Sequence, residues 1–503
     1  MLEPTGQGGA ADRGDGIASG PRDLSLGHWA VLAAFAIPVL FFNLGGARLL
    51  TYHESLQAGA AKVMAGTGEW LIPRLGGEPW LEKPPLPHWL TILSARLAGG
   101  FGEAAARAPS ALSGLILAFF LAAQTARWFG ATAGLLAGFV QASAVYVQNH
   151  GRLAEADMLL SVLVATALLA FSRANDPPGA GVRTARPWMV SFWILIGLTH
   201  LVKGLFFGAA IALSICLAWV AWRRDGAGLR RLLSPAGILC AAAIGSIWPL
   251  LVLPREPAAL DLWTHHLLGR ATGDDSSYAK PFWYYLSSWP WQMLPWTPFL
   301  VLGAPASLRR AWREPQSPDR FLWCWAMVPF LLLSLSVGKH HHFLIHALPA
   351  LSPIAALGLL RAGAWIRASG LVTLAALVLV GSLAVHLWVM PRRDPYRPER
   401  EFLREVESMV PLSERLLITG GQEIARPLFY LTRPVEGVFR PNDLPARIGG
   451  RQAVYVLARV SFGPDLARFG AVREIHRSLP SPKQREAENP LVLWRLETST
   501  PGR

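Results

Sequence analysis

The chain has 503 residues, of which 52% are hydrophobic and only 16% are charged. Soluble domains carry about 25% charged residues, so this composition, with 21 Trp, excludes an ordinary soluble enzyme and a disordered chain. The formal net charge of +14 need not indicate nucleic-acid binding, because basic residues in a membrane protein first report topology and contact with anionic lipid.

The N-terminal segment, residues 1–27, is polar and Gly-rich, and we expect it to be disordered and cytoplasmic. The first apolar run, residues 28–50, is long enough to cross a bilayer, which takes roughly 20 residues, and predicts an uncleaved anchor. Further apolar runs bring the expected number of spans to about 11. These runs lie at residues 109–128, 131–148, 156–172, 188–202, 204–222, 236–254, 288–308, 321–338, 342–360 and 369–390.

Arginine clusters between the runs favour this division. With residues 188–202 and 204–222 as separate spans, the clusters at residues 223–231, 309–320 and 361–367 all lie on the cytoplasmic side, as the positive-inside rule requires. Joining the two runs into one helix would place the same clusters outside. The 11-span topology therefore places the C-terminal region in the periplasm.

Residues 51–107 do not form a span. Leu56, Ala60, Val63 and Met64 recur at helical spacing and predict an amphipathic helix that lies along the membrane interface. Residues 87–98 are apolar but too short to cross, so they predict a second interfacial helix.

The composition changes near residue 391, where charge rises and short strand-like runs begin. These runs are Leu416–Thr419, Leu428–Leu431, Ala453–Ala458 and Leu491–Leu496. The predicted fold is therefore an all-α polytopic membrane domain, residues 28–390, followed by a small soluble α/β periplasmic domain, residues 391–503.

Ionisable residues gather at the expected outer ends of the spans. His53 and Glu54 directly follow the first span, and Asp157 begins the 156–172 span. An imidazole and carboxylates at the bilayer surface are suited to acid–base chemistry on a substrate that is part lipid and part polar. The alternative role for both acidic residues is to start a helix.

Most of the lysines also face the outer side in this topology, against the positive-inside bias. They are Lys62, Lys83, Lys203, Lys280 and Lys339. Lys203 interrupts two apolar runs, where an ionisable residue is costly and is a functional candidate. Snorkelling to the interface is one explanation for these lysines, and binding of an anionic group at the outer face is the other.

The sequence contains candidate metal ligands but no nucleotide-binding motif. The consecutive residues His340, His341 and His342 cannot all face one direction of a helix, so a divalent metal would need His53 or Asp157 as further N and O ligands. The sequence has no Walker loop and no G-x-G-x-x-G motif entering a helix, so it predicts no nucleotide site.

One motif resembles a known family. The spacing G-x-W-x-x-P-x-x-x-G-x-x-x-x-E-K-P-P-L, from Gly68 to Leu86, resembles the first periplasmic loop of GT-C membrane glycosyltransferases, closest to the lipid A aminoarabinose transferase and bacterial protein O-mannosyltransferase-like group. The resemblance continues through Arg152–Asp157, Lys203-Gly204 and the aromatic run 281–285, and it covers the membrane domain.

The resemblance implies a transferase that moves a sugar from a polyprenyl-phosphate donor, with inversion, to a hydroxyl or phosphate of a lipid A-like glycolipid, another glycan or a protein. The reaction would take place at the periplasmic face of a bacterial inner membrane, without nucleic acid. The residues implied to contact the donor phosphate are Lys83, Lys203, Arg270 and Lys339. The family usually has Asp-Glu where this chain has His53-Glu54, so the base is Glu54, Asp157 or His53.

Two other functions fit the composition less well. A transporter or lipid flippase predicts internal repeats and charges deep within spans, neither of which the sequence shows. A non-catalytic membrane scaffold would not need lysines and carboxylates on one membrane face. The sequence therefore favours a glycosyltransferase.

Overall fold

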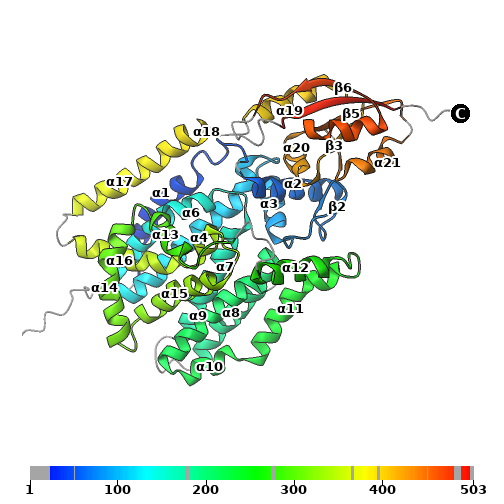
Figure 1. Ribbon diagram of the computed structural model, residues 1–503. Helices are drawn as coiled ribbons and strands as arrows, with labels where there is room; N and C mark the ends of the chain where they lie inside the picture. Colours follow the sequence, from blue (N-terminus) through cyan, green and yellow to red (C-terminus); the bar gives the residue numbers. More distant parts are fainter. Residues whose placement is uncertain are drawn as a thin grey trace, which may run out of the picture.

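Apolar helices form the body of the protein, and a small sheet domain covers one end of them (Figure 1). The computed structural model describes residues 23–49, 51–175, 182–204, 206–272, 279–363, 368–392, 397–433, 435–449, 451–480 and 489–498. Most of the predicted disordered segment, residues 1–27, lies outside these ranges. We call the end of the helical bundle beside the sheet domain the domain end.

Every apolar run predicted as a span contains a helix of the bundle. The helices are α1 (Leu26–Phe41), α4 (Glu103–Phe129), α5 (Ala131–Ser143), α6 (Val145–Gly151), α7 (Ala156–Ala174), α8 (Val182–Lys203), α9 (Phe207–Arg223), α10 (Gly226–Leu232), α11 (Pro235–Val252), α12 (Ala259–Thr272), α13 (Tyr284–Gln292), α14 (Thr297–Arg313), α15 (Asp319–Leu335), α16 (Leu348–Gly363) and α17 (Ala368–Ala384). Two short segments, η2 (His341–His346) and η3 (Val385–Val389), precede α16 and α18 (Met390–Arg392).

Within the described residues, five helices are long and apolar enough to cross a membrane by length and composition. The segment Ser369–Arg392 is one of them, and only 6% of its apolar window is buried inside the protein, as expected for a helix that faces lipid. Four shorter apolar helices accompany these five, and the total of 11 spans stays a prediction.

The break between α8 and α9 confirms that residues 188–222 are not one helix. Gly204 has φ 86° and Phe206 has φ 70°, a left-handed backbone that an α-helix cannot contain. The two helices then pack against each other. This turn leaves Lys203 as the last residue of α8.

The segment after α1 folds into α2 (Tyr52–Thr67), the hairpin strands β1 (Arg74–Leu75) and β2 (Glu78–Pro79), and α3 (Leu86–Leu97). A capping box between Thr51 and Glu54 starts α2, and Gly68, with φ 74°, ends it. The amphipathic helix is thus present, but protein covers its apolar face instead of lipid. Leu56 and Ala60 are fully buried, because α2 packs against α3 and the sheet domain.

The sheet domain contains five strands in the order β4-β3-β5-β7-β6. Their bounds are β3 (Leu416–Thr419), β4 (Glu436–Val438), β5 (Ala453–Arg459), β6 (Gly470–Arg477) and β7 (Leu491–Thr498). β3 is parallel to β4 and β5, whereas β7 is antiparallel to β5 and β6. The helices of the domain are α19 (Arg397–Met409), α20 (Ala425–Tyr430), α21 (Leu444–Ile448) and α22 (Gly463–Leu466).

One predicted strand of this domain is wrong. The run Leu428–Leu431 ends helix α20 and is not a strand. A short apolar run fits a buried helix as well as a strand, and here its residues pack against α2. Strands β4 and β6 were not predicted, since β4 is short and most residues of β6 are exposed.

Candidate functional site

Side chains from four separate segments meet at the domain end of the bundle. Their residues are His53 in α2, Lys83 in the loop after β2, Glu155 and Asp157 at the start of α7, and Lys203 at the end of α8. These groups influence one another electrostatically. We call these five residues the site cluster.

An ion pair joins Asp157 to Lys203 at the centre of the site cluster. The two side chains are only 6% and 11% exposed. The ammonium also lies 4.9 Å from the ring centre of Phe343 and 5.5 Å from that of Phe207. Cation–π interactions with these rings therefore help to stabilise its charge. Asp157 lies in the first turn of α7 and Lys203 in the last turn of α8, and both placements suit the helix dipoles.

Lys83 differs from the other lysines of this region. It forms no ion pair or hydrogen bond with any residue that the structure describes. Burial lowers the pKa of its ammonium, while Asp157 and Glu155 act against that shift. A partly buried cation without a direct partner is costly, and a bound anion would remove this cost. Its neighbours Pro84 and Pro85 restrict the backbone that carries it.

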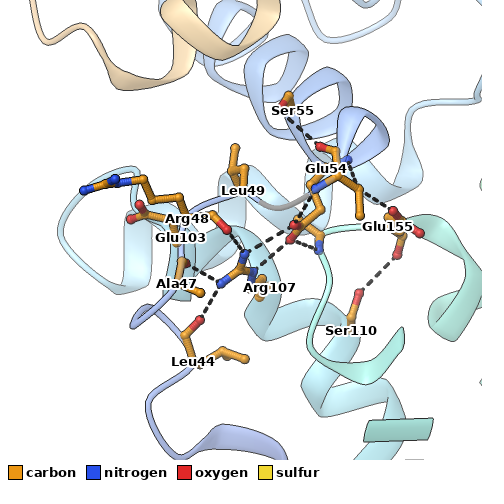
Figure 2. A network of polar contacts seen from close by, with 12 residues as sticks. Leu44, Ala47, Arg48, Leu49, Glu54, Ser55, Glu103, Arg107, Ser110 and Glu155 are labelled. Carbon is orange, nitrogen blue, oxygen red and sulfur yellow. Dashed lines mark hydrogen bonds and ion pairs between the residues drawn. The ribbon is translucent and has the colours of Figure 1, made fainter. Parts of the chain in front are cut away.

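Glu54 lies within a polar network that also includes Glu155 of the site cluster (Figure 2). Its carboxylate is fully buried and pairs with Arg107, with Nε 2.8 Å and Nη2 3.2 Å from its two oxygens. The backbone N–H of Ala154 donates to the same carboxylate at 2.8 Å. Arg107 also donates to the carbonyls of Leu44 and Ala47. The network therefore ties the end of α1 to α4 and to the loop before α7.

The contacts of Glu54 favour the helix-start alternative over a catalytic role. It caps α2 and accepts hydrogen bonds from both Arg107 and Ala154, so a substrate hydroxyl would have to displace a buried partner. Breaking a buried charge pair of this kind is expensive.

Glu155 is the residue of the site cluster that the sequence analysis did not select. Its carboxylate accepts a hydrogen bond of 2.6 Å from the hydroxyl of Thr51, and it precedes α7 as the N-cap. Burial, followed by the charge of Asp157, raises the pKa of this carboxyl to about 7. The signal in the sequence was the pair of acidic residues Glu155 and Asp157 at one helix start. The sequence analysis assigned a catalytic role to Asp157 alone.

His53 is exposed at the start of α2. Desolvation, then the Lys83 ammonium, lower the pKa of its imidazole to about 4. The ring is therefore neutral at pH 7. The charges of Glu82 and Asp157 also act on the imidazole and oppose this lowering of its pKa. His53 therefore lies at the edge of the site cluster.

The donor set does not fit the predicted metal site with His53 and Asp157 as ligands. Within the described ranges, no group of three or more His, Cys, Asp or Glu side chains is arranged to hold a metal ion. Asp157 is already paired with the Lys203 ammonium, which competes with a cation for the same carboxylate. His342 and His150 lie nearby, with ring centres 6.1 Å apart.

The two remaining phosphate-contact candidates have different outcomes. Lys339 is buried and donates to the carbonyls of Lys280 and Ser336, so it holds two loops together. Arg270 lies in α12, but its side chain is outside the described residues. The structure thus brings Lys83 and Lys203 together and ties Lys339 to neighbouring loop carbonyls.

Known proteins resemble this chain in both sequence and structure. A family model described as dolichyl-phosphate-mannose-protein mannosyltransferase matches residues 82–248. An undecaprenyl phosphate-alpha-4-amino-4-deoxy-L-arabinose arabinosyl transferase from Aeromonas hydrophila is 28% identical, over 72% of this chain and 66% of the relative. The Pseudomonas savastanoi pv. phaseolicola protein of the same name is 28% identical, over 84% and 78%.

The fold also matches a solved structure. ArnT from Cupriavidus metallidurans, crystallised with undecaprenyl phosphate, superposes with a TM-score of 0.75 over 93% of this chain and 98% of that one, at 22% identity. The predicted resemblance to GT-C membrane glycosyltransferases is confirmed. The chain is a multi-pass membrane protein with the fold of ArnT.

Proposed function

We propose that this protein is a glycosyltransferase that moves a sugar from a polyprenyl-phosphate carrier to an acceptor at the periplasmic face of a bacterial inner membrane. Residues 28–390 would form the catalytic domain and residues 391–503 the soluble one. The relatives are named for an undecaprenyl phosphate donor, so undecaprenyl phosphate is the carrier to test first. A lipid A-like glycolipid is the first acceptor to test, with another glycan or a protein as alternatives.

Lys83 is the observation that carries this proposal. Its ammonium is partly buried, has no direct partner among the described residues and lies beside the Asp157–Lys203 pair. A lipid phosphate that enters at the domain end would meet this cation at the edge of the apolar helices. Charge-assisted hydrogen bonds to phosphate are among the stronger ones in proteins.

The reaction that fits these groups is a direct displacement. The acceptor oxygen attacks the anomeric carbon of the sugar while the bond from that carbon to the phosphate oxygen breaks. The bond electrons leave with the polyprenyl phosphate, and the acceptor proton passes to a base on the protein. Lys83 would stabilise the charge that develops on the leaving phosphate. Lys203, held in place by its ion pair with Asp157, would add to this stabilisation.

Three residues compete for the role of base, and we propose Glu155. Its carboxyl has a pKa of about 7, close to the value at which a base is most effective near neutral pH. His53, with a pKa of about 4, is a weaker base and would instead orient the acceptor. Asp157 would hold Lys203, because protonation would break their ion pair.

Lys83→Met should weaken donor binding and use strongly, since it removes the cation but keeps an apolar side chain of similar length. Loss of one such contact costs about 2–4 kcal/mol of transition-state stabilisation. The measurements are kcat/KM for the donor, which reports the transition-state loss, and binding of undecaprenyl phosphate to the purified protein in lipid nanodiscs. Lys280→Met, an exposed lysine of another loop, is the matched control and should bind normally. Equal binding by wild type, Lys83→Met and Lys280→Met would show that Lys83 does not contact the phosphate.

The proposed orientation predicts opposite accessibility for two exposed positions. Ala227, in the Arg-rich helix α10, should be cytoplasmic, and Ser413, in the sheet domain, should be periplasmic. Cysteines introduced at each position of a Cys-free variant can be labelled in intact cells with a membrane-impermeant maleimide. Labelling at 413 alone is expected. Labelling at 227 with protection at 413 would invert the topology.

A further inference from the structure

The segment that carries His53 and Lys83, from α2 to α3, lies between the helical bundle and the sheet domain (Figure 1). Gly59 of α2 approaches the domain so closely that a Cβ atom would stand 2.4 Å from the carbonyl oxygen of Ala425. In the hairpin, the carbonyl of Gly76 accepts a hydrogen bond from the N–H of Phe439 at 3.2 Å. One side of the segment is therefore fixed to the domain by its backbone.

The same segment and the domain share one apolar core. Leu56, Leu75 and Trp80 of the segment pack with residues of α19, β3 and α20. Lys62 adds polar contacts, since its ammonium donates to the carbonyls of Phe429 at 2.8 Å and Leu431 at 2.6 Å. These contacts dock the domain, and none of them involves Tyr52 or Glu82, the residues directly before His53 and Lys83.

Gln422 makes a different kind of contact, directly beside the site cluster. Its side-chain carbonyl accepts a hydrogen bond from the Tyr52 hydroxyl, and its amide nitrogen donates to Glu82 at 3.2 Å. Tyr52 directly precedes His53, and Glu82 directly precedes Lys83. A single side chain of the sheet domain thus connects the two points at which the segment enters the site cluster.

The backbone around Gln422 is itself held in place. Gly420 has φ 144° and Gly421 has φ 62°, values that favour glycine. The N–H of Gly421 donates to the carbonyl of Phe439 at 2.8 Å. The amide of Gln422 is therefore presented from a fixed turn, as required of a group that positions others.

We infer that the sheet domain is a working part of the donor site, and that Gln422 is a positioning residue that sets the distance between His53 and Lys83 by joining Tyr52 to Glu82. This inference rests on the proposed function, in which Lys83 binds the carrier phosphate. The domain then acts on the donor through the loop, and Gln422 itself touches no reacting atom.

Two substitutions test the role of the amide. Gln422→Met removes both hydrogen bonds and keeps the volume. Gln422→Glu still accepts from Tyr52 but sets a carboxylate against Glu82, and like charges repel. Because small misplacements of a binding group are costly, we expect affinity for undecaprenyl phosphate to fall about tenfold in Gln422→Met and further in Gln422→Glu. The KM for donor should rise more than kcat falls.

The pH dependence of the affinity distinguishes positioning by Gln422 from a merely structural role. Protonation of the new carboxyl in Gln422→Glu gives it a donor for Glu82, so its affinity relative to wild type should recover as the pH is lowered toward 5. Gln422→Met should show no such recovery. Gln316→Met is the matched control, since Gln316 is exposed and contacts Arg223 at the far end of the bundle. It should bind undecaprenyl phosphate like wild type.

The outcomes separate this inference from the proposed function. Wild-type affinity in both Gln422 variants, with unchanged melting temperatures, would overturn the positioning role while leaving the carrier site intact. Weaker binding at every pH, together with a lowered melting temperature in both variants, would also overturn it, because Gln422 would then only help the domain to dock. A wild-type protein that does not bind undecaprenyl phosphate would refute the proposed function itself.

Discussion

Asp157→Asn should abolish sugar transfer and destabilise the protein at the same time. The substitution leaves the Lys203 ammonium buried between aromatic rings without its carboxylate partner. Breaking a buried ion pair by removing one partner costs about 3–5 kcal/mol, and this cost should lower the melting temperature in detergent or nanodiscs. Transfer should fall below detection, because the Lys203 ammonium, which supports the phosphate contact of Lys83, is no longer held in place.

The double variant Asp157→Asn/Lys203→Gln separates the two effects. With both charges replaced by amides, the Lys203 ammonium is no longer buried without its partner, so much of the lost stability should return. Activity should stay lost, because neither the carboxylate nor the cation is present. If the double variant regains activity together with stability, the pair is structural only. If Asp157→Asn alone keeps full activity, Asp157 has no part in the site.

Glu155→Gln should lower turnover by about 100-fold to 10,000-fold, the usual contribution of a general base. The carboxyl has a pKa of about 7 in the folded protein, so a reaction that needs its ionised form loses rate as the pH falls below 7. In wild type, kcat/KM should therefore fall about tenfold per unit below that pH and level off above it. The amide does not titrate, so this limb should vanish in Glu155→Gln.

His53 predicts a different pH profile if it is the base. Its pKa of about 4 would keep the imidazole neutral, and the rate nearly flat, down to about pH 5. His53→Asp, which restores the usual residue of the resembling family, should keep substantial activity under our assignment. A flat wild-type profile from pH 8 to 5, with full activity in Glu155→Gln and none in His53→Ala, would transfer the role of base to His53.

The sequence was most informative where charge stands in an unfavourable place. Lys83 and Lys203 were selected because they oppose the positive-inside bias, and the structure brings both beside Asp157. The break at Gly204 was also predictable, because the Arg clusters required an extra turn of the chain. Such signals are local and do not depend on what packs against the residue.

The sequence was least informative about long-range partners. Glu54 looked like a surface base, but it pairs with Arg107, 53 positions away. The apolar face of α2 looked suited to lipid, and a domain more than 300 residues later in the chain covers it, with Gln422 lying 370 positions from Tyr52. An amphipathic pattern reports that a face is covered and not what covers it.

The central claim is that the protein breaks the bond between a sugar and a polyprenyl phosphate. The most direct measurement uses purified protein in liposomes that contain undecaprenyl phosphate-linked 4-amino-4-deoxy-L-arabinose and lipid A. Chromatography would follow free undecaprenyl phosphate and glycosylated lipid A together. We predict that both form in equal amounts with wild-type protein and that neither forms with Asp157→Asn. Intact donor that crosses to the other leaflet, with no free undecaprenyl phosphate formed, would contradict the claim and indicate a flippase.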